Sequence, residues 1–98
     1  MEENAKRKQY KGPGHKLVAE IVSMKAPCAW GHEVGETFTV GVVPTGGMCG
    51  TLYHAAFPHI EMLQFGGKLP PTWAPPDEVS VDCADRKCSV RVRIRRVD

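Results

Sequence analysis

The stretch CGTLYHAAFPHIEMLQFGG, residues 49–67, decides the fold class. It is the only segment in which apolar residues recur at close to helical spacing, and Gly66 and Gly67 supply a stop signal at its end. Pro58 falls inside this run, so we expect one helix that is either kinked at the proline or split into two. The repeating apolar residues are Leu52, Ala56, Ile60 and Leu63.

The segments on both sides of this helix have the patterns of β-strands. Residues 15–26, HKLVAEIVSMKA, carry apolar residues on both faces, which predicts a fairly central strand, and residues 35–41, GETFTVG, predict a short antiparallel neighbour. Residues 78–83, EVSVDC, and 89–97, SVRVRIRRV, alternate apolar and polar residues around a plausible turn at residues 84–87, ADRK. The chain order strand, strand, helix, strand, strand predicts an α+β domain, a small, mostly antiparallel sheet with the helix on one face.

The length of 98 residues predicts one domain. We expect residues 1–14, which include KRKQYK, to form a flexible basic tail, and residues 15–98 to form the single α+β domain. No apolar run approaches the roughly 20 residues of a membrane-spanning helix, and the first residues contain no apolar signal region. These features predict a cytoplasmic protein that does not associate with a membrane.

The four cysteines hold the main chemical interest of the sequence. In a reducing compartment such residues are more often buried thiols, metal ligands or catalytic groups than disulfides. Cys28, Cys49 and Cys83 each fall at the end of a predicted element, where a backbone turn can direct three side chains to one place. Their spacings lack the tight C-x-x-C form of zinc ribbons. We therefore expect a metal site built from these three cysteines, with a purely structural role as buried thiols as the alternative.

The fourth ligand of such a site has several candidates. His32 follows Cys28 by four residues, His54 follows Cys49 by five, and Cys88 lies close to Cys83 in the chain; an exogenous group is also open. Three thiolates with a histidine suit zinc, whereas three or four thiolates also suit an iron–sulfur cluster. The residues do not choose between the two metals.

A thiol-dependent enzyme is the first alternative, with Cys49 as its nucleophile. If Cys49 begins the helix, the helix macrodipole and the unpaired N–H groups of the first turn favour its thiolate. His54 is badly spaced to act as its base on a regular helix, whereas His32 could approach from its loop. No pair of carboxylates indicates acid–base catalysis. At this size we expect the protein to act with a protein partner or as a homo-oligomer.

A basic nucleic-acid-binding module is the second alternative. Arg91, Arg93 and Arg95 alternate along the last strand and could contact phosphates from an exposed sheet face. A solvated strand whose charges discourage edge-to-edge pairing explains the same pattern, and the strand has no interleaved aromatic residues on which bases could stack. A net charge of +2 adds no support, so we do not expect nucleic acid as the partner.

Three segments, CAWGHEVGETF, CGTLYHAAFPHIEMLQFGGKLP and VDCADRKCSVRVRIRR, together resemble a group of small prokaryotic proteins of uncharacterised function. The pattern of that group is a C-x-x-G-H-x-x-G-[DE] loop, then C-x-x-x-Y-H-x-x-x-P running to an F-G-G turn, then C-P-D before a final strand. The resemblance covers residues 16–96. The matching positions are Cys28, Gly31, His32, Gly35, Cys49, Tyr53, His54, Pro58, Gly66, Gly67, Cys83 and Asp85.

The resemblance implies that Cys28, Cys49 and Cys83 belong to one site. Two positions depart from the pattern. Ala84 replaces the usual proline, and Cys88 falls where the pattern has no cysteine. The resemblance thus makes Cys88 the weakest of the four cysteines as a shared functional residue, despite its favourable spacing from Cys83.

Overall fold

The computed structural model describes residues 13–72 and 75–98. Its elements are the strands β1 (Leu17–Ser23), β2 (Thr37–Val40), β3 (Glu78–Asp82) and β4 (Arg91–Arg96), with the helix α2 (Gly50–Gln64) between β2 and β3. Across the sheet the strands lie in the order β2-β1-β4-β3, and all three pairs are antiparallel. The prediction of a small α+β domain is confirmed. The order across the sheet differs from the order along the chain, because β4 returns to pair with β1 and leaves β3 at an edge.

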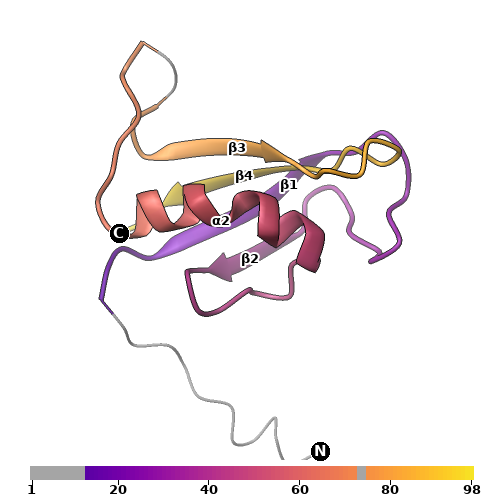
Figure 1. Cartoon of the computed structure of the whole chain (residues 1–98), viewed down its shortest axis with the longest axis horizontal. Coiled ribbons are helices and arrows are strands. Elements are labelled where there is room, and N and C mark those ends of the chain that lie inside the picture. Colours follow the sequence, from indigo (N-terminus) through magenta and orange to yellow (C-terminus); the bar gives the residue numbers. More distant parts are fainter. Residues whose placement is uncertain (1–12, 73–74) are drawn as a thin grey trace, which may run out of the picture.

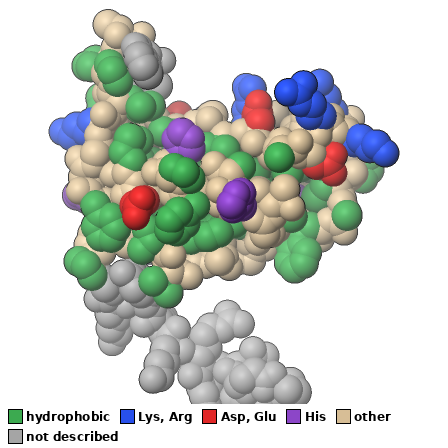
Figure 2. All heavy atoms as spheres, in the orientation of Figure 1, with side chains coloured by type: hydrophobic (Ala, Val, Ile, Leu, Met, Phe, Trp, Pro, Cys, Tyr) green, Lys and Arg blue, Asp and Glu red, His purple; other side chains and the backbone are tan. Residues whose placement is uncertain are grey.

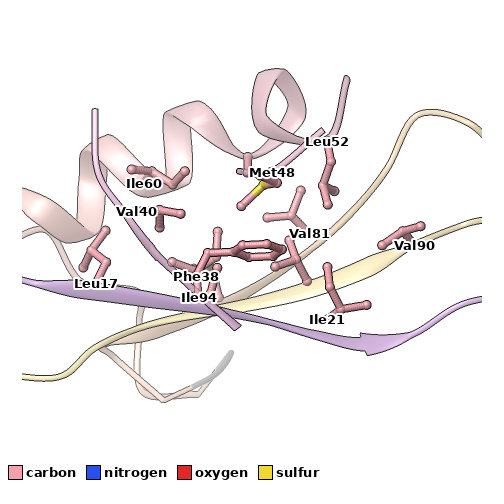
Figure 3. Packing of buried hydrophobic residues seen from close by; sticks show 14 of the residues in the cluster. Leu17, Ile21, Phe38, Val40, Met48, Leu52, Ile60, Val81, Val90 and Ile94 are labelled. Carbon is pink, nitrogen blue, oxygen red and sulfur yellow. The ribbon is translucent and has the colours of Figure 1, made fainter. Parts of the chain in front are cut away.

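The helix α2 covers one face of the sheet (Figure 1). The hydrophobic core fills the space between the helix and the sheet (Figure 3). Strand alternation directs one set of side chains toward the helix, as in β1, where Leu17, Ala19 and Ile21 are fully buried. Figure 3 shows Leu52 and Ile60 of α2 pointing at this layer. The buried hydrophobic residues are Leu17, Ala19, Ile21, Phe38, Val40, Met48, Leu52, Ala56, Ile60, Leu63, Val79, Val81, Cys88, Val90, Val92 and Ile94.

The helix is continuous through Pro58, so the alternative of two separate helices is wrong. Proline has no N–H, which leaves the carbonyl of His54 without its helical partner, but both residues are exposed and water can reach that carbonyl. Arg96 secures the other end of α2. Its Nη1 atom donates to the carbonyl oxygens of Leu63, at 2.6 Å, and Gly67, at 3.0 Å.

The hairpin between β3 and β4 is longer than the predicted four-residue turn. Strand β4 begins at Arg91 instead of residue 89, and residues 83–90 form the connection. Ser89 has a φ of +43°, a backbone conformation outside the β region. The extra length of this connection brings residues 83–90 to the end of the sheet at which α2 begins.

The N-terminus of α2, the loop of residues 24–36 and the connection of residues 83–90 lie at the same end of the molecule (Figure 1). The C-terminus lies at the opposite end. Most of the predicted tail of residues 1–14 lies outside the described residues. Its last two residues, Pro13 and Gly14, are described and lie next to Gln64. The carbonyl of Pro13 accepts a hydrogen bond from Gln64 Nε2 at 3.2 Å. Within residues 13–72 and 75–98, no helix is long and apolar enough to cross a membrane.

Candidate functional site

All four cysteines line one cavity of about 110 Å³ at the end of the molecule where α2 begins. The loop after β1, the start of α2 and the β3–β4 connection each form part of its wall. The lining residues are Cys28, Ala29, Trp30, His32, Cys49, Thr51, Leu52, Cys83, Asp85, Cys88 and Val90. Segments that are far apart in the sequence therefore bring their thiols to one place.

Cys28 is held by a tight turn in the loop after β1. The N–H of Gly31 donates to the carbonyl of Cys28 at 3.0 Å, and Gly31 has a φ of +92°, which favours glycine. The next N–H, that of His32, donates to the Sγ atom of Cys28 at 3.2 Å. The turn thus holds the Cys28 sulfur at the cavity wall.

Cys49 is the N-cap residue of α2, as the nucleophile hypothesis assumed. Its side chain makes no capping hydrogen bond and instead lines the cavity, at the positive end of the helix macrodipole. The glycines before it allow the chain to pass close to β2, because a Cβ atom on Gly46 would lie 2.6 Å from the carbonyl oxygen of Thr39. This close approach determines where the helix begins and hence where the Cys49 thiol lies.

Cys83 and Cys88 come from the β3–β4 connection. The N–H of Cys83 donates to the carbonyl of Val90 at 2.8 Å, which continues the pairing of the two strands to the cavity. Cys88 is the most buried thiol, with 3% of its surface exposed. Burial raises the pKa of the Cys88 thiol, and the Asp85 carboxylate and the thiols of Cys83 and Cys28 raise it further.

His32 is buried in the cavity wall, and both of its ring nitrogens are hydrogen-bonded. Nε2 accepts the backbone N–H of Cys49 at 3.0 Å, and Nδ1 lies 2.8 Å from Oε1 of Glu36. Because Nε2 accepts, the proton of the neutral ring resides on Nδ1 and is donated to Glu36. This bond is the main cause of the lowered pKa of Glu36. In this arrangement His32 positions Cys49 and has no free nitrogen with which to bind a metal.

His54 does not reach the cavity. It is exposed on α2 and lines a separate surface depression with Gly50, Tyr53, Phe57 and Pro58. The structure therefore brings together five of the six predicted ligands, the four cysteines and His32, and leaves His54 apart. The role of Glu36 as the partner of His32 was not predicted, because both residues lie in a loop, where a spacing of four residues does not indicate a contact.

The four cysteines line one cavity without forming a ready-made metal site. All four cysteines are free of disulfides. Among the residues that the structure describes, no group of three or more His, Cys, Asp or Glu side chains is arranged to hold a metal ion. A metal would therefore have to be bound with some rotation of the thiols about their side-chain bonds, or as a group large enough to span the space between them.

The alternating arginines of β4 are Arg91, Arg93 and Arg95, and they lie on the sheet face opposite α2. Two of them form ion pairs with carboxylates. Arg91 forms a two-point ion pair with Asp82, with its shorter contact at 2.7 Å, and Arg93 lies 2.8 Å from Glu20. Paired charges are less available to phosphates than free ones. This favours the solvated strand face over the nucleic-acid-binding module.

Searches of protein-family models, curated protein sequences and solved structures found no match, so the resemblance to the small prokaryotic group stays a prediction. The geometry of the chain's own residues is the basis for the proposal that follows.

Proposed function

We propose that the protein is a small metal-binding module whose four cysteines, Cys28, Cys49, Cys83 and Cys88, bind zinc or an iron–sulfur cluster. The observation that carries the proposal is their convergence from three separate segments on one cavity. Thiolates are the preferred ligands of both metal groups. In this account Cys88 is the fourth ligand, because it lines the cavity whereas His54 does not and His32 has both nitrogens engaged.

The surroundings of the cavity suit a centre with net negative charge, which four thiolates around zinc or iron would have. The N–H of His32 donates to Cys28, and the N-terminus of α2 lies at Cys49. Lys25, Arg86 and Lys87 are exposed on the two loops that form the cavity. Figure 2 shows basic side chains gathered at this end of the molecule. These donors and charges offset part of the negative charge of bound thiolates, to which the Asp85 carboxylate on the cavity wall adds.

We further propose an accessory or redox-related role beside a protein partner or a second copy of the chain, in a reducing compartment such as the cytoplasm. Trp30, on the cavity wall, is 62% exposed, and Val34, in the same loop, is 60% exposed. Cys28 and Val34 also share a depression on the outer surface. Exposed aromatic and aliphatic residues beside a centre are suited to contact with a partner.

The thiol-dependent enzyme has weaker support. A histidine base must accept the proton of the nucleophile, but Nε2 of His32 already accepts the backbone N–H of Cys49. His54 lies in a different depression. A Cys49 nucleophile would therefore need a base other than these two histidines.

The test is the metal content of protein purified under nitrogen, measured by mass spectrometry for the wild type and for Cys28→Ser, Cys49→Ser, Cys83→Ser and Cys88→Ser. His54→Gln is the matched control. We expect a stoichiometric metal in the wild type and the control, and a loss in each serine variant. Wild-type protein without metal, in which Cys49 alone reacts rapidly with an alkylating agent, would overturn the proposal in favour of the enzyme.

A further inference from the structure

The size of the four-cysteine cavity bears on what it holds. Four thiolates that bind one zinc ion place their sulfurs at about 2.3 Å from a single point, and little space remains between them. This cavity has a volume of about 110 Å³. A cavity of about 10–15 Å³ is already enough to admit one water molecule. The space is therefore several times larger than a single ion requires.

The arrangement of the thiols agrees with the volume. No three donor side chains within the described ranges, residues 13–72 and 75–98, are arranged around one ion position, although all four cysteines line the cavity. In a four-iron cluster each of four thiolates binds its own iron atom, and in a two-iron cluster two thiolates bind each iron. In both cases the four sulfurs surround a group of atoms and lie further apart than around one ion. Such a group accounts for both observations.

Sulfur predominates among the metal-ligating side chains that line the cavity. Both nitrogens of His32 are hydrogen-bonded, and one carboxylate oxygen of Asp85, Oδ1, accepts the N–H of Lys87 at 3.0 Å. The four cysteines are therefore the main ligand set of the cavity, and an all-thiolate set is the usual one for clusters. Leu52, Val90 and Trp30 add an apolar part of the wall that limits the access of water.

We infer that the cavity binds an iron–sulfur cluster, not a single zinc ion, through the four cysteines that line it. This inference rests on the proposed metal-binding function and narrows it. Each thiol loses its proton as its sulfur binds iron. The hydrogen bond from His32 N–H to Cys28 Sγ would persist as a bond to a cluster ligand, a contact of the kind that tunes the reduction potential of such centres.

The experiment uses the full chain, stripped of metal and kept under nitrogen with a thiol reductant. One sample receives ferric iron and sulfide, and the thiol reductant supplies the electrons for any ferrous iron that the cluster contains. A second sample receives zinc, and a third receives iron, sulfide and zinc. After gel filtration, iron, acid-labile sulfide and zinc per chain are measured, with the visible spectrum and the paramagnetic resonance spectrum after dithionite reduction. The His54→Gln variant serves as the control. The double variant Cys83→Ser/Cys88→Ser lacks two of the four proposed ligands.

We expect the wild type and the His54→Gln control to retain iron and sulfide in similar amounts, with visible absorption and a reduced-state signal, even when zinc is present. The double variant should lose most of its iron and most of its sulfide. Retention of one zinc per chain with no iron and sulfide would overturn this inference but leave the metal-binding function standing. Retention of no metal from any sample would overturn both. Because the decisive comparison is made on the wild type, it does not depend on the folding of a variant.

Discussion

The Nε2 atom of His32 lies 3.0 Å from the backbone nitrogen of Cys49, so a buried imidazole in the loop after β1 accepts the N–H of the residue that caps α2. The same His32 donates its own backbone N–H to the Sγ of Cys28. One residue thus connects two of the cavity's three walls and holds two thiols in place. Its importance lies in this positioning, which differs from the ligand role that the sequence indicated.

Replacing His32 with leucine should therefore destabilise the metal-free protein. The N–H of Cys49 would lose its partner, and a buried donor without a partner costs about 1–3 kcal/mol. Urea denaturation measures the free energy of unfolding, and His54→Leu is the matched control, for which we expect a change within about 0.5 kcal/mol because His54 is exposed. Equal effects of the two substitutions would contradict the positioning role.

The bond between His32 and Glu36 should make stability depend on pH in the acid range. It lowers the pKa of Glu36 below its ordinary value of 4.5. A carboxyl group whose pKa is lowered on folding stabilises the protein above its unfolded pKa, and this contribution is lost as the pH falls through the folded value. As the pH is lowered from about 6 to about 3, the urea concentration at the unfolding midpoint should fall less steeply for Glu36→Gln than for the wild type. Parallel curves would show that the bond has no effect on stability.

The raised pKa of Cys88 predicts the pH dependence of metal binding. Cys88 must lose its proton to bind a metal, and burial together with Asp85 makes that loss harder than for an ordinary thiol. Metal affinity, measured by competition with a coloured chelator, should rise between about pH 6 and 8. Asp85→Asn removes a negative charge beside the thiol and should raise the affinity at the lower pH values. An affinity independent of pH would exclude Cys88 as a ligand.

Trp30 provides an optical probe of the same cavity. Its indole Nε1 donates to the carbonyl of Gly47 at 3.0 Å, and the residue lines the cavity. In a Trp73→Phe background, the fluorescence of Trp30 should fall strongly when a coloured iron–sulfur cluster binds and much less when zinc binds, because zinc has no visible absorption. The Cys28→Ser variant of this protein should show no such loss. Unchanged emission on cluster binding would contradict the placement of the centre beside Trp30.

Much of the fold could be predicted because local patterns determine it. Alternation in β1 and β4 identified two strands that turn out to be central, and the helical spacing identified α2. The length of the β3–β4 connection could not be predicted, because the alternating run before β4 continues to Ser89, whose positive φ has no sequence signal as strong as a glycine. The order of strands across the sheet depends on long-range pairing, which local patterns do not report.

The site was predicted in part. The placement of Cys28, Cys49 and Cys83 at element ends anticipated that they would share one cavity. Cys88 was the thiol that the family resemblance favoured least, yet it is the most buried of the four in that cavity. Proximity in the chain suggested His54, but the helix directs it to another surface. The spacing of five residues already turns His54 away from Cys49 on a regular helix, and the structure agrees with that spacing.

X-ray absorption at the edge of the bound metal, on wild-type protein purified under nitrogen, identifies the atoms that bind the metal. We expect a first shell made only of sulfur, at about 2.3 Å, with no nitrogen from histidine. An additional shell from neighbouring iron atoms would support the cluster. A shell that contains histidine nitrogen would contradict the four-cysteine site, and a sample with no metal above background would contradict metal binding itself.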